Sequence, residues 1–80
     1  MNVKRLSEMI KGDIGKIMNI RGKPGIHRYL LELGIVVNRI VQVVNVDFDS
    51  RYSPVMVRIG KYTHLLNHDV ASTIKVELNS

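Results

Sequence analysis

One segment of the chain has the apolar spacing of a helix. Ile26, Leu30 and Leu33 follow one another at positions i, i+4 and i+7, which form one face of a helix with about 3.6 residues per turn. Gly34 comes next, and glycine readily adopts the left-handed conformation in which many helices end. The pattern therefore predicts a helix over 25–34, which either plugs an open end of a β-structure or carries an interaction surface.

The remaining apolar positions predict short strands. We expect them at 13–20, 39–46, 54–59, 62–66 and 74–78. The alternation of apolar and polar residues is cleanest in the last of these strands. Gly15 inside the first strand indicates a bulge or the close approach of another segment. Gly60 suits the positive φ of a two-residue hairpin turn between the third and fourth strands.

The segments between the strands have the composition of turns and loops. Residues 6–12 are expected to form one short turn, 47–53 a polar turn, and 68–73 a short turn capped by Asn67. The basic loop 21–25 contains two glycines and a proline, which exclude regular structure. It leads directly into the predicted helix, whose first backbone N–H groups form a candidate anion site.

Five short strands with tight turns and one inserted helix are typical of a small barrel. The predicted fold class is mainly β: an SH3-like barrel with the short helix inserted after the first strand. An OB-fold is the alternative. The 80 residues, 1–80, are expected to form a single domain with a small core. Three tyrosines and one phenylalanine are the only aromatic residues, so Val, Ile, Leu and Met must fill this core.

Composition narrows the class of protein. There is no cysteine, which excludes a disulfide framework, a cysteine-based zinc site and thiol catalysis. No apolar run approaches the ~18–20 residues of a membrane-spanning helix, and the N-terminus lacks the apolar segment of a signal peptide. We therefore expect a soluble, cytoplasmic protein. The net charge of +5 favours acidic partners such as nucleic acid, anionic lipid or an acidic protein surface. The basic residues are spread from Lys4 to Lys75 without a cluster and aromatic residues are few, so we expect no stable complex with nucleic acid.

The acidic residues do not form the pattern of a catalytic site. Asp47 and Asp49 share a predicted turn, but that spacing suits solvent or a cation as well as catalysis. Serine, histidine and aspartate are present without a nucleophile motif. We therefore predict no catalytic residues, and that the protein is not an enzyme.

Histidine is the residue type that points to a metal. Imidazole and carboxylate both bind transition metals, and the candidates are His27, His64, His68, Glu32 and Asp69. His64 and His68 are four residues apart, a spacing that converges on a helix, but His64 is expected in a strand. We predict no resident cofactor or metal, and keep His64 and His68 as candidate ligands for an incidentally bound divalent transition metal.

Several segments, taken in order, give the chain a family resemblance. They are the turn at 6–12, Gly-Lys-Ile at 15–17, the leucine-rich helix and its Leu-Gly end at 30–35, the strand at 54–60, and the segments 65–66, 70–71 and 74–76. Together they resemble the FeoA family, the small cytosolic component of ferrous iron transport in bacteria and archaea. Val37-Asn38 replaces the family's usual Pro-Gly turn after the helix, and asparagine tolerates the left-handed geometry of such a turn.

The resemblance implies an SH3-like barrel that acts as an accessory or regulator of the FeoB transporter, a membrane protein with a cytosolic GTPase domain. It supplies no catalytic residues. Two alternatives stay open: a small basic barrel that binds nucleic acid, and a metal-sensing module like the C-terminal domain of iron-dependent repressors. A homodimer is also compatible with a barrel that has exposed strand edges.

For a binding module we expect function to lie in surface loops and in the outward side of the helix. Basic residues attract an acidic partner, and tyrosine serves as an interface anchor because it buries apolar area while its hydroxyl stays wet. The predicted partner-binding residues are Arg21, Lys23, His27, Arg28, Tyr29, Arg51 and Lys61.

Overall fold

The computed structural model describes residues 2–46 and 53–78. In chain order the elements are β1 Val3–Arg5, the 3-10 helix η1 Leu6–Glu8, β2 Ile14–Ile20, α1 Pro24–Glu32, β3 Ile40–Val46, β4 Val55–Ile59, β5 Tyr62–Leu66, α2 His68–Ala71 and β6 Ile74–Leu78. Except for Ser53, the predicted turn at 47–53 lies outside the described residues.

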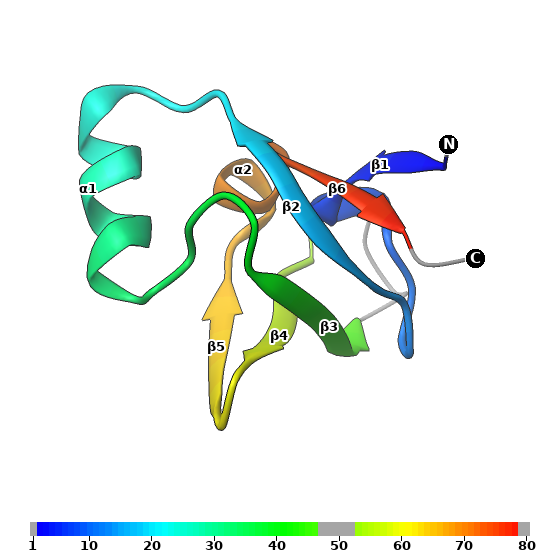
Figure 1. The fold of residues 1–80 in the computed structure, drawn as a ribbon. Coiled ribbons are helices and arrows are strands. Elements are labelled where there is room, and N and C mark those ends of the chain that lie inside the picture. Colours follow the sequence, from blue (N-terminus) through cyan, green and yellow to red (C-terminus); the bar gives the residue numbers. More distant parts are fainter. Residues whose placement is uncertain (1, 47–52, 79–80) are drawn as a thin grey trace.

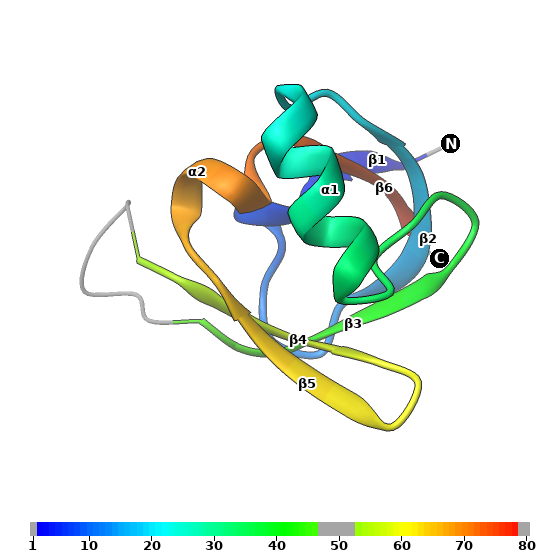
Figure 2. The same cartoon turned by 90° about the vertical axis from the view of Figure 1, so that its left-hand side faces the viewer.

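The strands form one antiparallel sheet in the order β1-β6-β2-β3-β4-β5. The sheet curls into a small barrel, and α1 stands to one side of it (Figure 1). Viewed at 90° to this, α1 crosses in front of the barrel (Figure 2). The prediction of a mainly β, SH3-like barrel is confirmed, with all five expected strands. Strand β1 was not predicted, because Val3 is the only apolar residue among its three and no alternation can be read.

Aliphatic side chains fill the inside of the barrel. Ile17, Val57 and Val76 come from three different strands and are 0% exposed. Leu6 of η1 and Leu30 of α1 complete this core and are also 0% exposed. Burying one such side chain stabilises the fold by about 1.5–3 kcal/mol, so Leu6 and Leu30 contribute strongly to holding η1 and α1 on the barrel.

Strand β2 passes very close to β6. A Cβ atom at Gly15 would clash with the carbonyl oxygen of Glu77 and would lie 2.6 Å from Cγ1 of Val76, so only glycine fits there. Further along, the register of the two strands shifts between Ile17 and Asn19, which marks a bulge. Both features that Gly15 indicated occur in this strand, the close approach at the glycine and the bulge beyond it.

Helix α1 ends at Glu32, two residues before the end predicted from Gly34. Gly34 has a φ of 77°, and its N–H donates to the carbonyl of Leu31 at 3.0 Å. The N–H of Ile35 donates to the carbonyl of Leu30 at 2.9 Å, which completes the pair of bonds of a Schellman motif. The motif turns the chain back beneath the helix, where Ile35 is buried with Leu30.

The turn that follows is held against β2. Asn38 has a φ of 77°, so asparagine adopts the left-handed conformation predicted for it. Its N–H donates to the carbonyl of Ile17 at 2.8 Å, and the N–H of Ile17 donates to the carbonyl of Arg39 at 2.9 Å. These bonds fix the segment after α1 alongside β2.

Two other turn predictions are confirmed and one is revised. The Oδ1 atom of Asn67 accepts the N–H of Val70 at 2.8 Å, which caps α2. Gly60 has a φ of 61° in the hairpin between β4 and β5. The predicted turn at 6–12 forms a 3-10 helix only over its first three residues, after which the chain turns again at 11–12.

Candidate functional site

Helix α1 is attached to the barrel along one face. Leu30 is fully buried, and Ile26 and Leu33 pack against the core while partly exposed. The other faces of the helix are open to solvent: Leu31 is 65% exposed and Tyr29 is 44% exposed. The helix therefore borders a recess on each of its two flanks.

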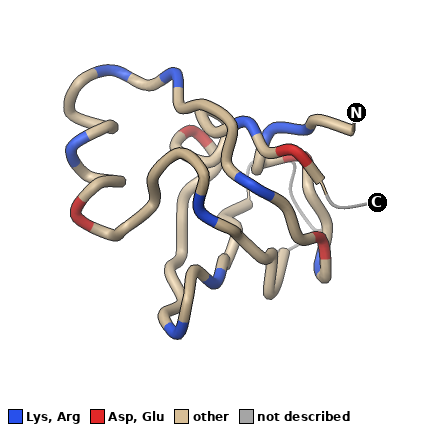
Figure 3. The backbone as a smooth tube through the Cα atoms, viewed as in Figure 1, with Lys and Arg blue, Asp and Glu red and all other residues tan. Residues whose placement is uncertain are grey.

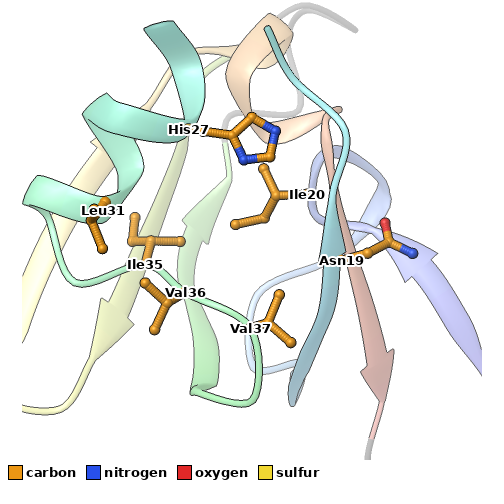
Figure 4. Close-up of a pocket in the computed structure, with 7 residues that line it drawn as sticks. All are labelled: Asn19, Ile20, His27, Leu31, Ile35, Val36 and Val37. Atoms are coloured by element: carbon orange, nitrogen blue, oxygen red, sulfur yellow. The ribbon is translucent and has the colours of Figure 1, made fainter. Parts of the chain in front are cut away.

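The first recess, which we call the α1–β2 hollow, has a volume of about 400 Å³. Its lining residues are Asn19, Ile20, His27, Leu31, Ile35, Val36 and Val37 (Figure 4). His27 and Leu31, one helical turn apart on α1, point toward Ile20 and Ile35, respectively (Figure 4). The side chain of Asn19 points away from this space, so the surface of the hollow is aliphatic apart from the imidazole.

Two aliphatic side chains that line the α1–β2 hollow are largely exposed to solvent. Leu31 and Val37, on opposite walls of the hollow, are 65% and 46% exposed. Covering such apolar surface contributes about 25 cal/mol per Å². The hollow therefore suits an apolar side chain of another molecule.

Basic residues surround α1 and the loop that leads into it (Figure 3). Arg21 and Lys23 lie in that loop, Arg28 lies on the helix, and all three are exposed. Arg39 is also exposed, just before β3, but its guanidinium lies near Gly60 of the β4–β5 hairpin and does not border this hollow. Between residues 14 and 46 the only acidic residue is Glu32, at the C-terminal end of the helix. The apolar hollow thus has a basic surround, which favours an acidic partner.

The loop that enters α1 is pinned to the other end of the chain, because the N–H of Arg21 donates to the carbonyl of Thr73 at 2.8 Å. The anion site predicted at the helix start is not built there. Pro24 has no N–H, and the N–H groups of Ile26 and His27 donate to the carbonyl of Lys23 at 2.9 and 3.1 Å. The expected donors are therefore mostly engaged within the helix itself.

The structure brings five of the predicted partner-binding residues together around α1: Arg21, Lys23, His27, Arg28 and Tyr29. Lys61 lies elsewhere, at the hairpin of β4 and β5, with its Nζ atom 5.7 Å from the ring centre of Tyr62. Arg51 lies outside the described residues. Within the part of the chain that the structure describes, the predicted set therefore consists of a group on α1 and its entry loop, of which His27 lines the α1–β2 hollow, and one distant residue.

The sequence did not predict the aliphatic residues that line the α1–β2 hollow. Ile20, Val36 and Val37 have the composition of ordinary strand or core residues, and only the tertiary structure leaves them facing a recess. The exposure of Leu31 was predictable from the sequence, because Leu31 follows the buried Leu30 and lies off the face of the helix that packs on the barrel.

The second recess, which we call the α1–β5 hollow, has a volume of about 420 Å³ and lies at the other flank of the helix. Its lining residues are Glu32, Leu33, Gly34, Arg39, Ile59, Tyr62 and His64. It combines an acid, a base and an imidazole with apolar surface, so its chemistry differs from that of the α1–β2 hollow.

The candidate metal ligands do not converge. His64 is half-buried on β5, as expected for a strand residue, whereas His68 is the first residue of α2. Across residues 2–46 and 53–78, no group of three or more His, Asp or Glu side chains is placed to hold a metal ion. The described residues therefore do not form a set that fits a resident metal. Neither described helix has the length and apolar character needed to cross a bilayer.

A comparison with models of protein families shows the family of this chain. The model of the FeoA domain matches residues 4–78. The chain belongs to the FeoA domain family. The resemblance found in the sequence is thereby confirmed, and it places the chain in a family associated with ferrous iron transport.

Solved structures agree with this fold. An iron uptake regulatory protein FeoA superposes with a TM-score of 0.88 at 24% identity, covering 98% of this chain and 100% of that one. FeoA of Stenotrophomonas maltophilia, solved with zinc and described as a prokaryotic SH3 domain protein, gives 0.75 at 24% identity over 90% of this chain and 87% of that one.

The domain also occurs inside larger proteins. A manganese-dependent transcriptional repressor superposes with a TM-score of 0.84 at 24% identity, over 96% of this chain but 42% of the repressor. At these identities the similarity establishes the fold. A search of curated proteins by sequence finds no match.

Proposed function

We propose that this FeoA-family chain is a non-enzymatic, cytoplasmic accessory protein of ferrous iron transport, which docks on the cytosolic, GTPase-containing part of the FeoB transporter. Family membership supports the transport system. The single observation that carries docking is the α1–β2 hollow, an aliphatic recess of about 400 Å³ next to basic residues on α1 and its entry loop.

The hollow defines the chemistry of the partner segment. An aliphatic or aromatic side chain enters between Leu31 and Val37 and removes their exposed surface from water. Burial of one such side chain provides about 1.5–3 kcal/mol. Acidic residues beside it face Arg21, Lys23 and Arg28, and such charge complementarity accelerates association and selects the partner.

A charge placed in the hollow tests this docking mode. Leu31→Asp should weaken binding of the purified cytosolic domain of FeoB at least tenfold, which corresponds to about 1.4 kcal/mol, because an unpaired carboxylate would have to be desolvated. Leu31 is 65% exposed, so the fold tolerates the change. Ile10→Asp is the matched control, since Ile10 is 52% exposed and lies away from α1.

Titration calorimetry at two salt concentrations measures both variants. Loss of binding in Leu31→Asp with wild-type binding in Ile10→Asp supports the proposal. No binding of the wild-type chain to the FeoB domain contradicts the partner, and equal binding of the two variants contradicts the docking surface.

Nucleic acid is the second acidic partner that the basic surround of α1 favours. It would bind with an affinity that falls steeply with salt, because phosphate contacts release counterions. A fluorescence titration with duplex and single-stranded oligonucleotides separates the two candidates. Tight, strongly salt-dependent binding to the oligonucleotides, unaffected by Leu31→Asp, would favour nucleic acid over FeoB.

A further inference from the structure

The two ends of the sheet, β1 and β5, differ in how well they are protected from pairing. Strand β1 has three residues, two of which, Lys4 and Arg5, are basic, and short charged edges resist pairing. Strand β5 has five residues with no proline, acid, lysine or arginine. Its register with β4 runs through all five pairs without a shift. Only β5 therefore offers a regular, uncharged edge.

Hairpin geometry decides which backbone groups of β5 face outward. In a two-residue hairpin the residues that flank the turn, here Ile59 and Tyr62, exchange hydrogen bonds, and bonded and non-bonded pairs then alternate along the strands. Thr63 and Leu65 therefore direct their N–H and C=O groups away from β4. Within residues 2–46 and 53–78, no other strand pairs with this edge.

Two large side chains of β5 are also uncovered. Tyr62 is 63% exposed and Leu65 is 59% exposed. Strand β5 and its hairpin project from the body of the protein in both views (Figures 1 and 2). The edge is therefore accessible to an incoming strand.

We propose that β5 pairs antiparallel with β5 of a second copy of this chain, around a two-fold axis at His64. In this register Thr63 of each copy lies opposite Leu65 of the other, and each such pair exchanges both of its backbone hydrogen bonds. The contact uses the same surface twice, as a closed two-fold interface requires.

The charges at the two ends of β5 favour this partner. Arg58 and Lys61 are exposed at the hairpin end, whereas Asp69 is exposed in α2, beyond the other end. Antiparallel pairing places the hairpin end of one copy beside the α2 end of the other, so unlike charges approach each other. The pairing is independent of the proposed docking, because Leu31 and the α1–β2 hollow take no part in it.

Disulfide trapping tests the register, because the chain has no cysteine. His64→Cys places two thiols on a non-hydrogen-bonded pair, whose Cα atoms are about 4.5 Å apart, within the ~4.4–6.8 Å that a disulfide spans. Oxidised glutathione should convert this variant to a covalent dimer on a non-reducing gel. Tyr29→Cys is the control: Tyr29 is 44% exposed on α1, so chance collisions link it at least as readily as the half-buried position 64.

A backbone substitution tests the edge itself. Thr63→Pro removes an outward N–H and leaves the ladder with β4 intact, because proline is tolerated where an edge strand faces solvent. Thr63→Val keeps the N–H and the branched side chain. By sedimentation velocity from micromolar to millimolar concentration, we expect the wild type and Thr63→Val to approach twice the monomer mass, and Thr63→Pro to stay monomeric. If Thr63→Pro does not fold by circular dichroism, Leu65→Lys replaces it as a charged edge.

The proposal is overturned if the wild type stays monomeric throughout, if Thr63→Pro or Leu65→Lys associates like the wild type, or if His64→Cys cross-links no faster than Tyr29→Cys. It is also overturned if Leu31→Asp abolishes the association, because the copies would then meet through α1.

Discussion

Helix α1 separates two hollows of nearly equal volume, about 400 and 420 Å³. Both are bordered by α1, yet their chemistry differs. The α1–β2 hollow is lined by aliphatic residues and one imidazole. The α1–β5 hollow contains Glu32, Arg39 and His64.

The chemistry of the two linings indicates which flank of α1 is better suited to bind a partner. Covering aliphatic surface releases free energy in proportion to area, whereas covering charged groups costs free energy unless each finds a partner. Size does not distinguish the two hollows, so the chemistry of their linings does. The α1–β2 flank is therefore the one that we propose as the docking surface, and the following predictions test that contrast.

The largest effect is expected from Leu30, the buried residue that anchors α1 to the core. Leu30→Ala should lower the free energy of unfolding by about 2–5 kcal/mol, because Leu30 is 0% exposed and its removal leaves a cavity beneath α1. Urea unfolding measures it. The neighbouring Leu31→Ala is the control and should change stability by less than about 0.5 kcal/mol, as exposed positions do. Equal losses would mean that α1 does not rest on Leu30.

The turn that ends α1 should have the next largest effect. Gly34→Ala should cost about 1–2 kcal/mol, because an L-residue resists the left-handed φ of 77° found there. No atom lies within 4 Å of the added Cβ, so the cost is conformational rather than steric. Gly25→Ala adds the same atom inside α1, also without a neighbour, and should stabilise the protein by about 0.5–1 kcal/mol. Urea unfolding compares the pair, and a neutral Gly34→Ala would contradict the Schellman ending.

A comparison of the two flanks by truncation sharpens the contrast directly. Leu31→Ala should weaken binding of the FeoB cytosolic domain roughly tenfold, about 1.4 kcal/mol, because an apolar contact in the α1–β2 hollow is lost. Tyr62→Ala, in the α1–β5 hollow, should leave the affinity within about twofold, a difference below 0.5 kcal/mol. Surface-immobilised binding measurements give both values. The reverse order would move the docking surface to the β5 flank.

The smallest effect is expected from removing one basic side chain beside the α1–β2 hollow. Arg28→Gln should reduce the association rate by roughly two- to threefold and flatten its salt dependence, with little change in dissociation, because an exposed charge acts mainly by steering. Arg58→Gln removes the same charge from β4, away from α1, and should change neither. Stopped-flow association at several salt concentrations distinguishes them, and identical behaviour would mean that steering comes from net charge alone.

Much of the fold follows from local signals. The spacing of Ile26, Leu30 and Leu33 identified α1, and the alternating residues identified five strands. Asn38 and Asn67 adopt the turn and cap that their side chains favour. Strand β1 was not predictable in this way, because a three-residue edge acquires its structure only by pairing with β6.

The candidate site divides in the same manner. Arg21, Lys23, Arg28 and Tyr29 were predicted together because they are neighbours in sequence around one helix. The aliphatic walls of the α1–β2 hollow come from β2, α1 and the segment after it, so their meeting depends on tertiary structure. Lys61 was predicted in the hairpin that follows the third expected strand, and the structure places it there, between β4 and β5 and apart from the residues around α1.

Residue types and short-range spacing predicted the main helix, five of the six strands, an aliphatic core and the family resemblance. The folded structure was needed to show that α1 stands to one side of the barrel with Leu31 and Val37 exposed, and that β5 ends the sheet with Thr63 and Leu65 facing outward. The physical reason is that burial and strand pairing are relations between distant segments. The sequence shows that a residue is leucine, but only the folded chain shows whether that leucine is buried or exposed.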